Sequence, residues 1–186
     1  MLSILVSVVA ISVGSSEPPP CWLRDDPADL ELRISRLDST STVLGADTVK
    51  VCYSRPRRLE RPIMGRLVPF GVPWRFGANE ATAIHTPVAL AIGDAEIPAG
   101  SYSLYVIPGQ DQWQVIINRN VERWGVPLNA DVRSMDLDSA VARVEETPEL
   151  VENFTMRFEP VSSDSVDLVW EWERTRVRVR IRRAES

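Results

Sequence analysis

The sequence has only one histidine, His85, among its 186 residues. Any Ser-His-Asp triad would have to use this residue, and a metal site built from several histidines is excluded. If residues 80–85 are extended, Glu80 and His85 point to opposite faces of a strand, so an acid-base pair of the two would need a bulge. We therefore interpret His85 as a polar strand residue and predict neither a metal nor a cofactor.

Cysteine is nearly as scarce, since Cys21 and Cys52 are the only two. Neither belongs to a CxxC motif and Cys52 has no histidine near it in sequence, so thiol catalysis is not indicated. In an exported protein these two residues could form one disulfide. The alternative is that Cys21 lies in a mobile leader and that Cys52 is a small apolar strand residue.

Positive charge is also in deficit, with a formal net charge of -5 and a sequence pI of about 5.0. Nucleic-acid backbones select for basic protein faces, so nucleic acid is not an expected partner. An anionic membrane surface is disfavoured for the same reason. The partners that this leaves open are a small polar or anionic ligand and another protein.

No apolar run reaches the length of about 20 residues that a membrane span requires. Residues 1–16 carry no charge, and an apolar stretch from Leu2 to Val13 leads to small residues and a proline-rich stop at 17–20. This pattern is typical of a signal peptide, although it lacks the usual basic residue near its start. We expect export to the periplasm or beyond, with no stable membrane span after cleavage. The three prolines before Cys21 disfavour lipid modification of that residue.

Alternation of apolar and polar residues dominates from Leu30 onward, and long helical periodicity is absent. Turn signals rich in proline and glycine separate the alternating runs, and they make one hairpin clear, that of residues 101–107 and 113–118. The expected strands include residues 30–35, 49–54, 81–85, 88–92, 95–97, 101–107, 113–118, 141–144 and 154–158.

A chain of this length fits one domain behind a short leader. The sequence predicts a signal peptide over residues 1–16, a flexible segment over 17–29 and an all-β domain over 30–183. Short strands with turn signals between them favour a single-domain antiparallel β-sandwich, or a flattened barrel, of about eight to ten strands.

A final hairpin is predicted over residues 166–182. Val166 begins a series of apolar residues on one face, and the opposite face carries arginines at 176, 178, 180 and 182 with glutamates at 171 and 173. The arginines could form a stripe that binds a polyanion. Because the glutamates face them, a solvated and self-neutralised strand face is the preferred interpretation, and we assign them no function.

Polar side chains gather in residues 74–82, inside an otherwise strand-like chain. Charged groups are costly to bury unless they are paired, so this cluster predicts either a satisfied polar network or a binding surface. In a binding site, arginine would grip a carboxylate or phosphate while the neighbouring polar groups orient it. The candidate ligand-binding residues are Arg75, Asn79, Glu80 and Thr82, with Arg55 and Arg66 contributed by flanking loops.

Two other interpretations of this cluster remain open. Glu80 could act as the general base of a hydrolase or isomerase, with Arg75 stabilising negative charge. Alternatively, Glu80 could pair with an arginine and fix the long loop that precedes it, in which case the domain would be a structural, partner-binding module. The role of three tryptophans is also left open by the sequence. Trp74, Trp113 and Trp124 could form a sugar-binding platform or fill the core.

The ordered motifs of the chain resemble the domain-of-unknown-function (DUF) 2911 family of bacterial, mostly exported proteins. The resemblance runs from about Leu30 to Ile181. It implies a β-rich exported domain and transfers no catalytic residue, because the family has no established activity. Phe76 departs from the threonine that is common in the family segment, and Arg180 from a proline. The motifs that carry the resemblance are residues 53–56, 65–71, 74–82, 98–104, Trp113, Asn118, 124–125 and 168–173.

Overall fold

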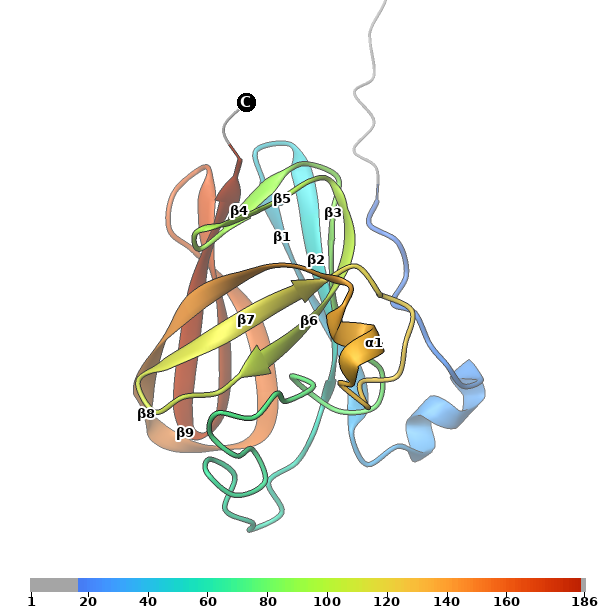
Figure 1. The fold of residues 1–186 in the computed structure, drawn as a ribbon, viewed down its shortest axis with the longest axis vertical. Coiled ribbons are helices and arrows are strands. Elements are labelled where there is room, and N and C mark those ends of the chain that lie inside the picture. Colours follow the sequence, from blue (N-terminus) through green and yellow to red (C-terminus); the bar gives the residue numbers. More distant parts are fainter. Residues whose placement is uncertain (1–16, 185–186) are drawn as a thin grey trace, which may run out of the picture.

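The protein folds as one curled antiparallel sheet, seen in a computed structural model that describes residues 17–184 (Figure 1). The predicted signal peptide, residues 1–16, lies outside the described residues. Two short helices accompany the sheet: the 3-10 helix η1 (Pro27–Leu32) and α1 (Ala130–Arg133). The strands are β1 (Arg36–Leu44), β2 (Asp47–Arg55), β3 (Thr82–Thr86), β4 (Leu90–Ile92), β5 (Ala95–Ile97), β6 (Gly100–Ile107), β7 (Gln112–Asn118), β8 (Asp136–Pro160) and β9 (Ser165–Arg183).

The nine strands are hydrogen-bonded in the order β1-β2-β3-β6-β7-β8-β9-β4-β5. All strand pairs in this order are antiparallel, and the edge strands β1 and β5 are not paired with each other. The sheet therefore curls round a core without closing, in the manner of a flattened and open barrel. The predicted all-β class and strand number are confirmed.

The interior of the curled sheet is filled by aromatic side chains. Phe76 and Trp170 meet edge to face with ring centroids 4.8 Å apart, and Trp74 stacks on Trp172 at 5.9 Å. Trp113 is fully buried beside them, so it belongs to the core. Aromatic pairs of this kind contribute packing energy beyond the apolar area they bury. The core thus fixes residues 74–76, which lead directly into the polar cluster.

The first predicted strand, residues 30–35, is wrong. Asp26 caps a 3-10 helix here by accepting a hydrogen bond from the backbone of Ala28, and Pro27 provides the fixed φ that suits a first helical position. Leu32 and Ile34, whose alternation indicated a strand, are 82% and 74% exposed. The sheet begins only at Arg36.

The predicted final hairpin is also wrong, because β9 is one continuous strand. Its buried face changes phase, from even-numbered positions up to Trp172 to odd-numbered positions from Val177. The change of phase coincides with a φ of 58° at Glu173 and with register shifts opposite it, where β8 carries the extra residues between Glu146 and Thr155 in the manner of β-bulges. No glycine, proline or asparagine marks a turn at this point. Residues 141–144 and 154–158, which were expected as two strands, likewise belong to the single strand β8.

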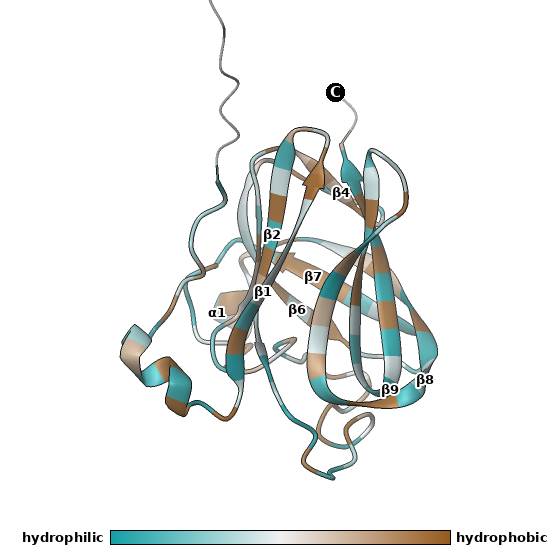
Figure 2. Cartoon of the chain, turned by 180° about the vertical axis from the view of Figure 1, so that it is seen from behind, coloured by the Kyte–Doolittle hydropathy of each residue, from teal (hydrophilic) through white to brown (hydrophobic). Residues whose placement is uncertain are grey.

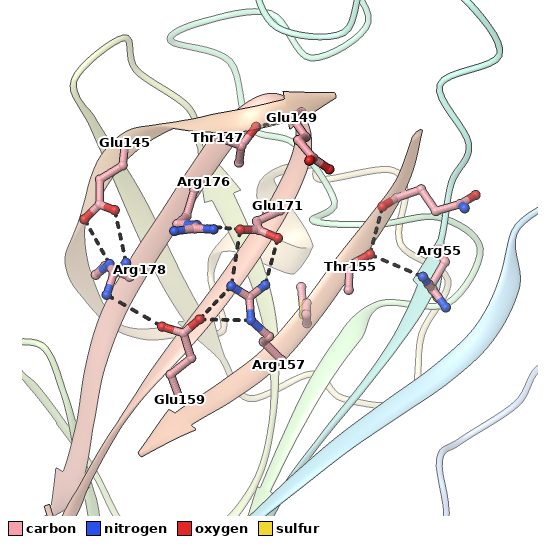
Figure 3. A network of polar contacts seen from close by, with 12 residues as sticks. Arg55, Glu145, Thr147, Glu149, Thr155, Arg157, Glu159, Glu171, Arg176 and Arg178 are labelled. Carbon is pink, nitrogen blue, oxygen red and sulfur yellow. Dashed lines mark hydrogen bonds and ion pairs between the residues drawn. The ribbon is translucent and has the colours of Figure 1, made fainter. Parts of the chain in front are cut away.

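The outer face of β8 and β9 carries a ladder of ion pairs (Figure 3), and the hydropathy of the two strands alternates along their length (Figure 2). Glu171 accepts hydrogen bonds from Arg157 at 2.8 Å and from Arg176 at 2.5 Å. Burial alone would raise the pKa of Glu171, but these two arginines outweigh it and lower the pKa. The ladder supports the interpretation of a self-neutralised strand face.

The chain before the sheet lies along its outer side as the N-terminal strap, which we define as residues 17–35 (Figure 1). The sequence predicts flexibility over most of it. In the structure, a disulfide joins Cys21 of the strap to Cys52 of β2, and Lys50 donates to the carbonyl of Pro19 at 3.2 Å. These contacts fasten the first half of the strap to β2.

Candidate functional site

Residues 74–82 form a crowded turn that connects the long loop after β2 to β3. Gly77 has φ of 151°, and a Cβ atom at this position would lie 3.0 Å from the carbonyl oxygen of Ser54, so the turn requires glycine. The Thr82 hydroxyl donates to the carbonyl of Phe76 at 2.6 Å and closes the turn. Thr82 is fully buried. Its hydroxyl therefore holds the turn together and is not presented to a ligand.

Glu80 lies at the end of this turn with only 5% of its surface exposed. Its carboxylate accepts two hydrogen bonds from Arg33 of the strap, from Nη1 at 2.8 Å and from Nη2 at 2.9 Å. The backbone N–H of Arg24 donates to the same carboxylate at 3.2 Å. The hydrogen bonding that Arg33 donates to Glu80 is the main cause of the raised pKa of Arg33. Both oxygens of Glu80 are thus occupied by the chain itself, and no feature of this geometry favours Glu80 as a general base.

Trp124 and Asn79 also hold the strap, and together with Glu80 we call these residues the clamp. The guanidinium carbons of Arg24 and Arg33 lie 5.2 and 5.8 Å from the centre of the Trp124 ring, within cation-π range. The Asn79 side chain donates to the carbonyl of Ser35 at 2.9 Å. The geometry matches the interpretation in which Glu80 pairs with an arginine of the chain itself. That arginine, Arg33, belongs to the strap and not to the long loop.

Arg123 belongs to the candidate site and is not indicated by the sequence. Its side chain is 8% exposed and donates to the carbonyls of Asn120, Trp124 and Gly125 and to the hydroxyl of Ser103. Burial lowers its pKa. Because it bonds the backbone on both sides of the Trp124 ring, Arg123 sets the position of that ring against the strap. A lone arginine in a loop gives no sequence signal for such a role.

Arg75 points to a different place from the rest of the cluster. Its Nε donates to the carbonyl of Gly77 at 3.2 Å, and its stem packs on Gly125. The side chain is half-buried, and desolvation lowers its pKa. Within residues 17–184, no carboxylate lies within ion-pair distance of it. Arg75 lines a pocket of about 570 Å³, whose other members include Trp74, Arg61, Ile34, Leu59, Leu67 and Val126.

A second pocket, of about 390 Å³, shares Ile34 with the first and is lined by Arg33, Arg36, Arg55 and Arg57. Arg55 is occupied there, since it donates to Asp38, the Phe154 carbonyl and Thr155, each at 3.2 Å. Figure 3 shows the contact with Thr155. Arg36 and Arg57 are exposed, and neither makes an ion pair within the described part of the chain. This side of an otherwise acidic protein is therefore basic.

The six predicted ligand-binding residues separate into three groups. Asn79, Glu80 and Thr82 are engaged within the chain, whereas Arg75 and Arg55 line the two adjoining pockets. Arg66 is exposed in the long loop and lines neither pocket. The spacing of the motif in sequence does not reveal this division, because consecutive residues of a turn point in different directions.

His85 lies in β3 and is 4% exposed, and its Nδ1 is 2.7 Å from the hydroxyl oxygen of Ser101. Burial, followed by the nearby Lys50 ammonium, lowers its pKa. The unfolded chain, with an ordinary histidine pKa near 6.5, then binds more protons than the folded protein just below that pH. The stability contributed by neutral His85 is present above pH 6.5 and is lost as pH falls through the folded-state pKa.

We accordingly expect the free energy of unfolding of the wild type to fall between pH 7 and pH 5.5, in urea unfolding at fixed ionic strength. His85→Gln removes this titration and should flatten the profile over the same interval. Carboxylates with lowered pKa values, such as Glu171, act only at lower pH. Parallel profiles for the two proteins would contradict the assignment to His85.

Neither a metal cluster nor a membrane helix is found in the described part of the chain. Over residues 17–184, no three His, Cys, Asp or Glu side chains come together in a way that could hold a metal ion. In the same residues, no helix has the length and apolar character needed to cross a membrane.

Comparison with known proteins assigns the family and no activity. No curated protein and no solved structure matches the chain. Residues 35–181 match the family described as "Protein of unknown function (DUF2911)". The match spans the whole sheet except the last two residues of β9, and it includes the turn at 74–82 and Trp124. The chain therefore belongs to the DUF2911 family.

Proposed function

We propose that the protein is a binding module for a small organic anion with an apolar body, and that Arg75 holds the charged group. The observation that carries this proposal is the half-buried Arg75 guanidinium, which has no acidic partner in the described chain and lines a pocket of about 570 Å³. A desolvated guanidinium with unused N–H donors favours a carboxylate or phosphate. The pocket has the volume that is usual for small-ligand sites.

The walls of the pocket indicate the nature of the rest of the ligand. Ile34, Leu59, Leu67 and Val126 all line it, and each is between 43% and 74% exposed. Large apolar side chains gathered at one hollow mark a surface that is covered when a ligand or partner binds. A half-buried arginine and exposed aliphatic side chains that line one pocket suit a molecule with an anionic head and a hydrocarbon or aromatic body.

The neighbouring basic pocket would assist this binding. Arg36 and Arg57 raise the local positive potential on a protein whose net charge is -5. Such a local field concentrates anions at the site and increases their association rate. We propose that the binding takes place outside the cytoplasm, which is supported by the apolar N-terminal sequence and by the Cys21–Cys52 disulfide.

Isothermal titration calorimetry with octanoate, at concentrations below its critical micelle concentration, tests the proposal. The wild type should bind octanoate, and Arg75→Gln should weaken the binding about 10- to 100-fold, as expected for the loss of a charge-assisted contact. Octylammonium, which has the same chain and the opposite charge, should not bind at this pocket.

Arg66→Gln provides the matched control, because it removes the same charge from the same loop region outside the pocket. Its octanoate affinity should remain within about twofold of the wild type, since a distant surface charge is largely screened at physiological salt. Equal affinities of Arg75→Gln and the wild type, with both folded, would overturn the proposal.

A further inference from the structure

The clamp around Arg33 consists of a receptor and an occupant from separate parts of the chain. Glu80 and Trp124 lie within residues 35–181, the part that matches the family, whereas Arg33 lies in the strap just before it. The strap contributes Asp25, which accepts from Nη2 of Arg33 at 2.8 Å, and Arg24, whose backbone N–H donates to Glu80 at 3.2 Å and whose guanidinium carbon lies 5.2 Å from the centre of the Trp124 ring. The carboxylate and the aromatic ring that contact the guanidinium are therefore properties of the β domain.

The chemistry of this receptor matches a guanidinium group. The buried Glu80 carboxylate accepts two N–H hydrogen bonds, at 2.8 and 2.9 Å. Arginine can make this bidentate contact, which we call the fork, and lysine cannot. The Trp124 ring lies 5.8 Å from the guanidinium carbon, where a planar delocalised cation is attracted to the ring. An unpaired buried carboxylate would be costly, so the site requires a cationic occupant.

Exchange of the occupant breaks the contacts of Arg33 with Glu80 and Asp25, but it does not disturb the core. None of the residues in η1, which precedes Arg33, is buried, so releasing this half of the strap exposes no core. The disulfide at Cys21 keeps the strap attached at its other half. Arg33 thus behaves as a tethered ligand that competes at a high effective concentration, and an outside ligand would bind only when Arg33 leaves.

We propose that Glu80 and Trp124 form an arginine-binding site that the strap fills in cis, and that the site accepts the arginine side chain of another peptide segment when Arg33 is withdrawn. The ligand class is a peptide that presents an accessible arginine. This site takes the opposite charge from the Arg75 pocket and is tested with different probes, although Ile34 and Ser35 of the strap also line that pocket.

Arg33→Ala tests the proposal by emptying the site. The probes are Nα-acetyl-arginine amide and Nα-acetyl-lysine amide, which carry the same charge on different head groups. The arginine probe should raise the Tm of Arg33→Ala in a dose-dependent way and bind it about tenfold more tightly than the lysine probe, because only guanidinium makes the fork. The wild type, whose site is full, should show no such response.

Two more variants make the test decisive. Arg33→Ala with Glu80→Gln should lose the preference for the arginine probe, because the acceptor carboxylate is gone. If Arg33→Ala alone does not fold, Arg33→Lys keeps a cation beside Glu80 and gives up the fork, and the arginine probe should then displace the lysine side chain. A folded Arg33→Ala or Arg33→Lys protein that shows no preference for arginine over lysine would overturn the proposal.

Discussion

Glu80→Gln is expected to lower the free energy of unfolding by about 3 to 5 kcal/mol, the usual cost of breaking a buried ion pair. The side chains of Glu80 and Arg33 are 5% and 11% exposed, so the amide would leave the largely desolvated Arg33 charge without its buried partner and with only the more exposed Asp25. For a domain of this size, the change corresponds to a decrease in Tm of about 6 to 20 °C. Differential scanning calorimetry and urea unfolding at pH 7 measure it.

Glu145→Gln is the matched control for this prediction. Glu145 is also paired with an arginine, Arg178, at 3.0 Å, but its side chain is 44% exposed. Exposed pairs contribute about 0 to 1 kcal/mol, so this variant should unfold close to the wild type. Equal effects of the two substitutions would contradict the role of Glu80 as the buried anchor of the strap. The double variant Glu80→Gln with Arg33→Ala should lose less than the sum of the single variants, since the pair is shared.

Removal of the disulfide is expected to have the second large effect. Cys21 and Cys52 are 31 positions apart, and releasing a loop of that length increases the entropy of the unfolded chain by an amount worth about 3 to 4 kcal/mol. Cys21→Ser with Cys52→Ala should therefore unfold at a correspondingly lower urea concentration. Cys52 is buried, so alanine is the substitution that fits its site.

Reducing agent provides an internal control for the same prediction. It should lower the stability of the wild type to that of the double variant and leave the double variant unchanged. Limited proteolysis adds a local measure, because cleavage at Arg24 should become faster once the strap is no longer fastened at Cys21. Identical unfolding of the wild type with and without reductant would contradict a stabilising disulfide.

The sequence predicts the sheet better than it predicts the strap, and the reason is physical. β6 and β7 are bounded by proline-glycine turns and have clear alternation, so local chemistry alone defines them. The Arg33–Glu80 pair joins residues 47 positions apart, and no local pattern encodes such a contact. The strap also alternates at Leu30 to Ile34 without burying a face, and it therefore mimics a strand.

The candidate site could be predicted in part for the same reason. Composition alone marked residues 74–82 as a polar cluster in an apolar chain. It could not show that Glu80 faces the strap whereas Arg75, in the same turn, faces a pocket. Those directions depend on Gly77 and on the left-handed φ angles of Phe76 and Asn79, 59° and 57°, which turn successive side chains away from one another.

The division of the cluster changes how each residue should be tested. Glu80 and Asn79 belong to the fastening of the strap, so their substitution affects stability first. Arg75 makes one hydrogen bond, to a backbone carbonyl, so its substitution affects binding first. A general base needs a free carboxylate oxygen, whereas both oxygens of Glu80 accept hydrogen bonds from the strap.

A crystal structure of the protein grown with octanoate tests the central claim most directly. The account predicts the octanoate carboxylate at hydrogen-bond distance, about 3 Å, from the Arg75 guanidinium. The hydrocarbon chain should lie across Ile34, Leu59 and Val126, and Glu80 should still be bonded to Arg33. Octanoate bound elsewhere on the surface, or a ligand at Glu80 and Asn79 with the strap displaced, would contradict it.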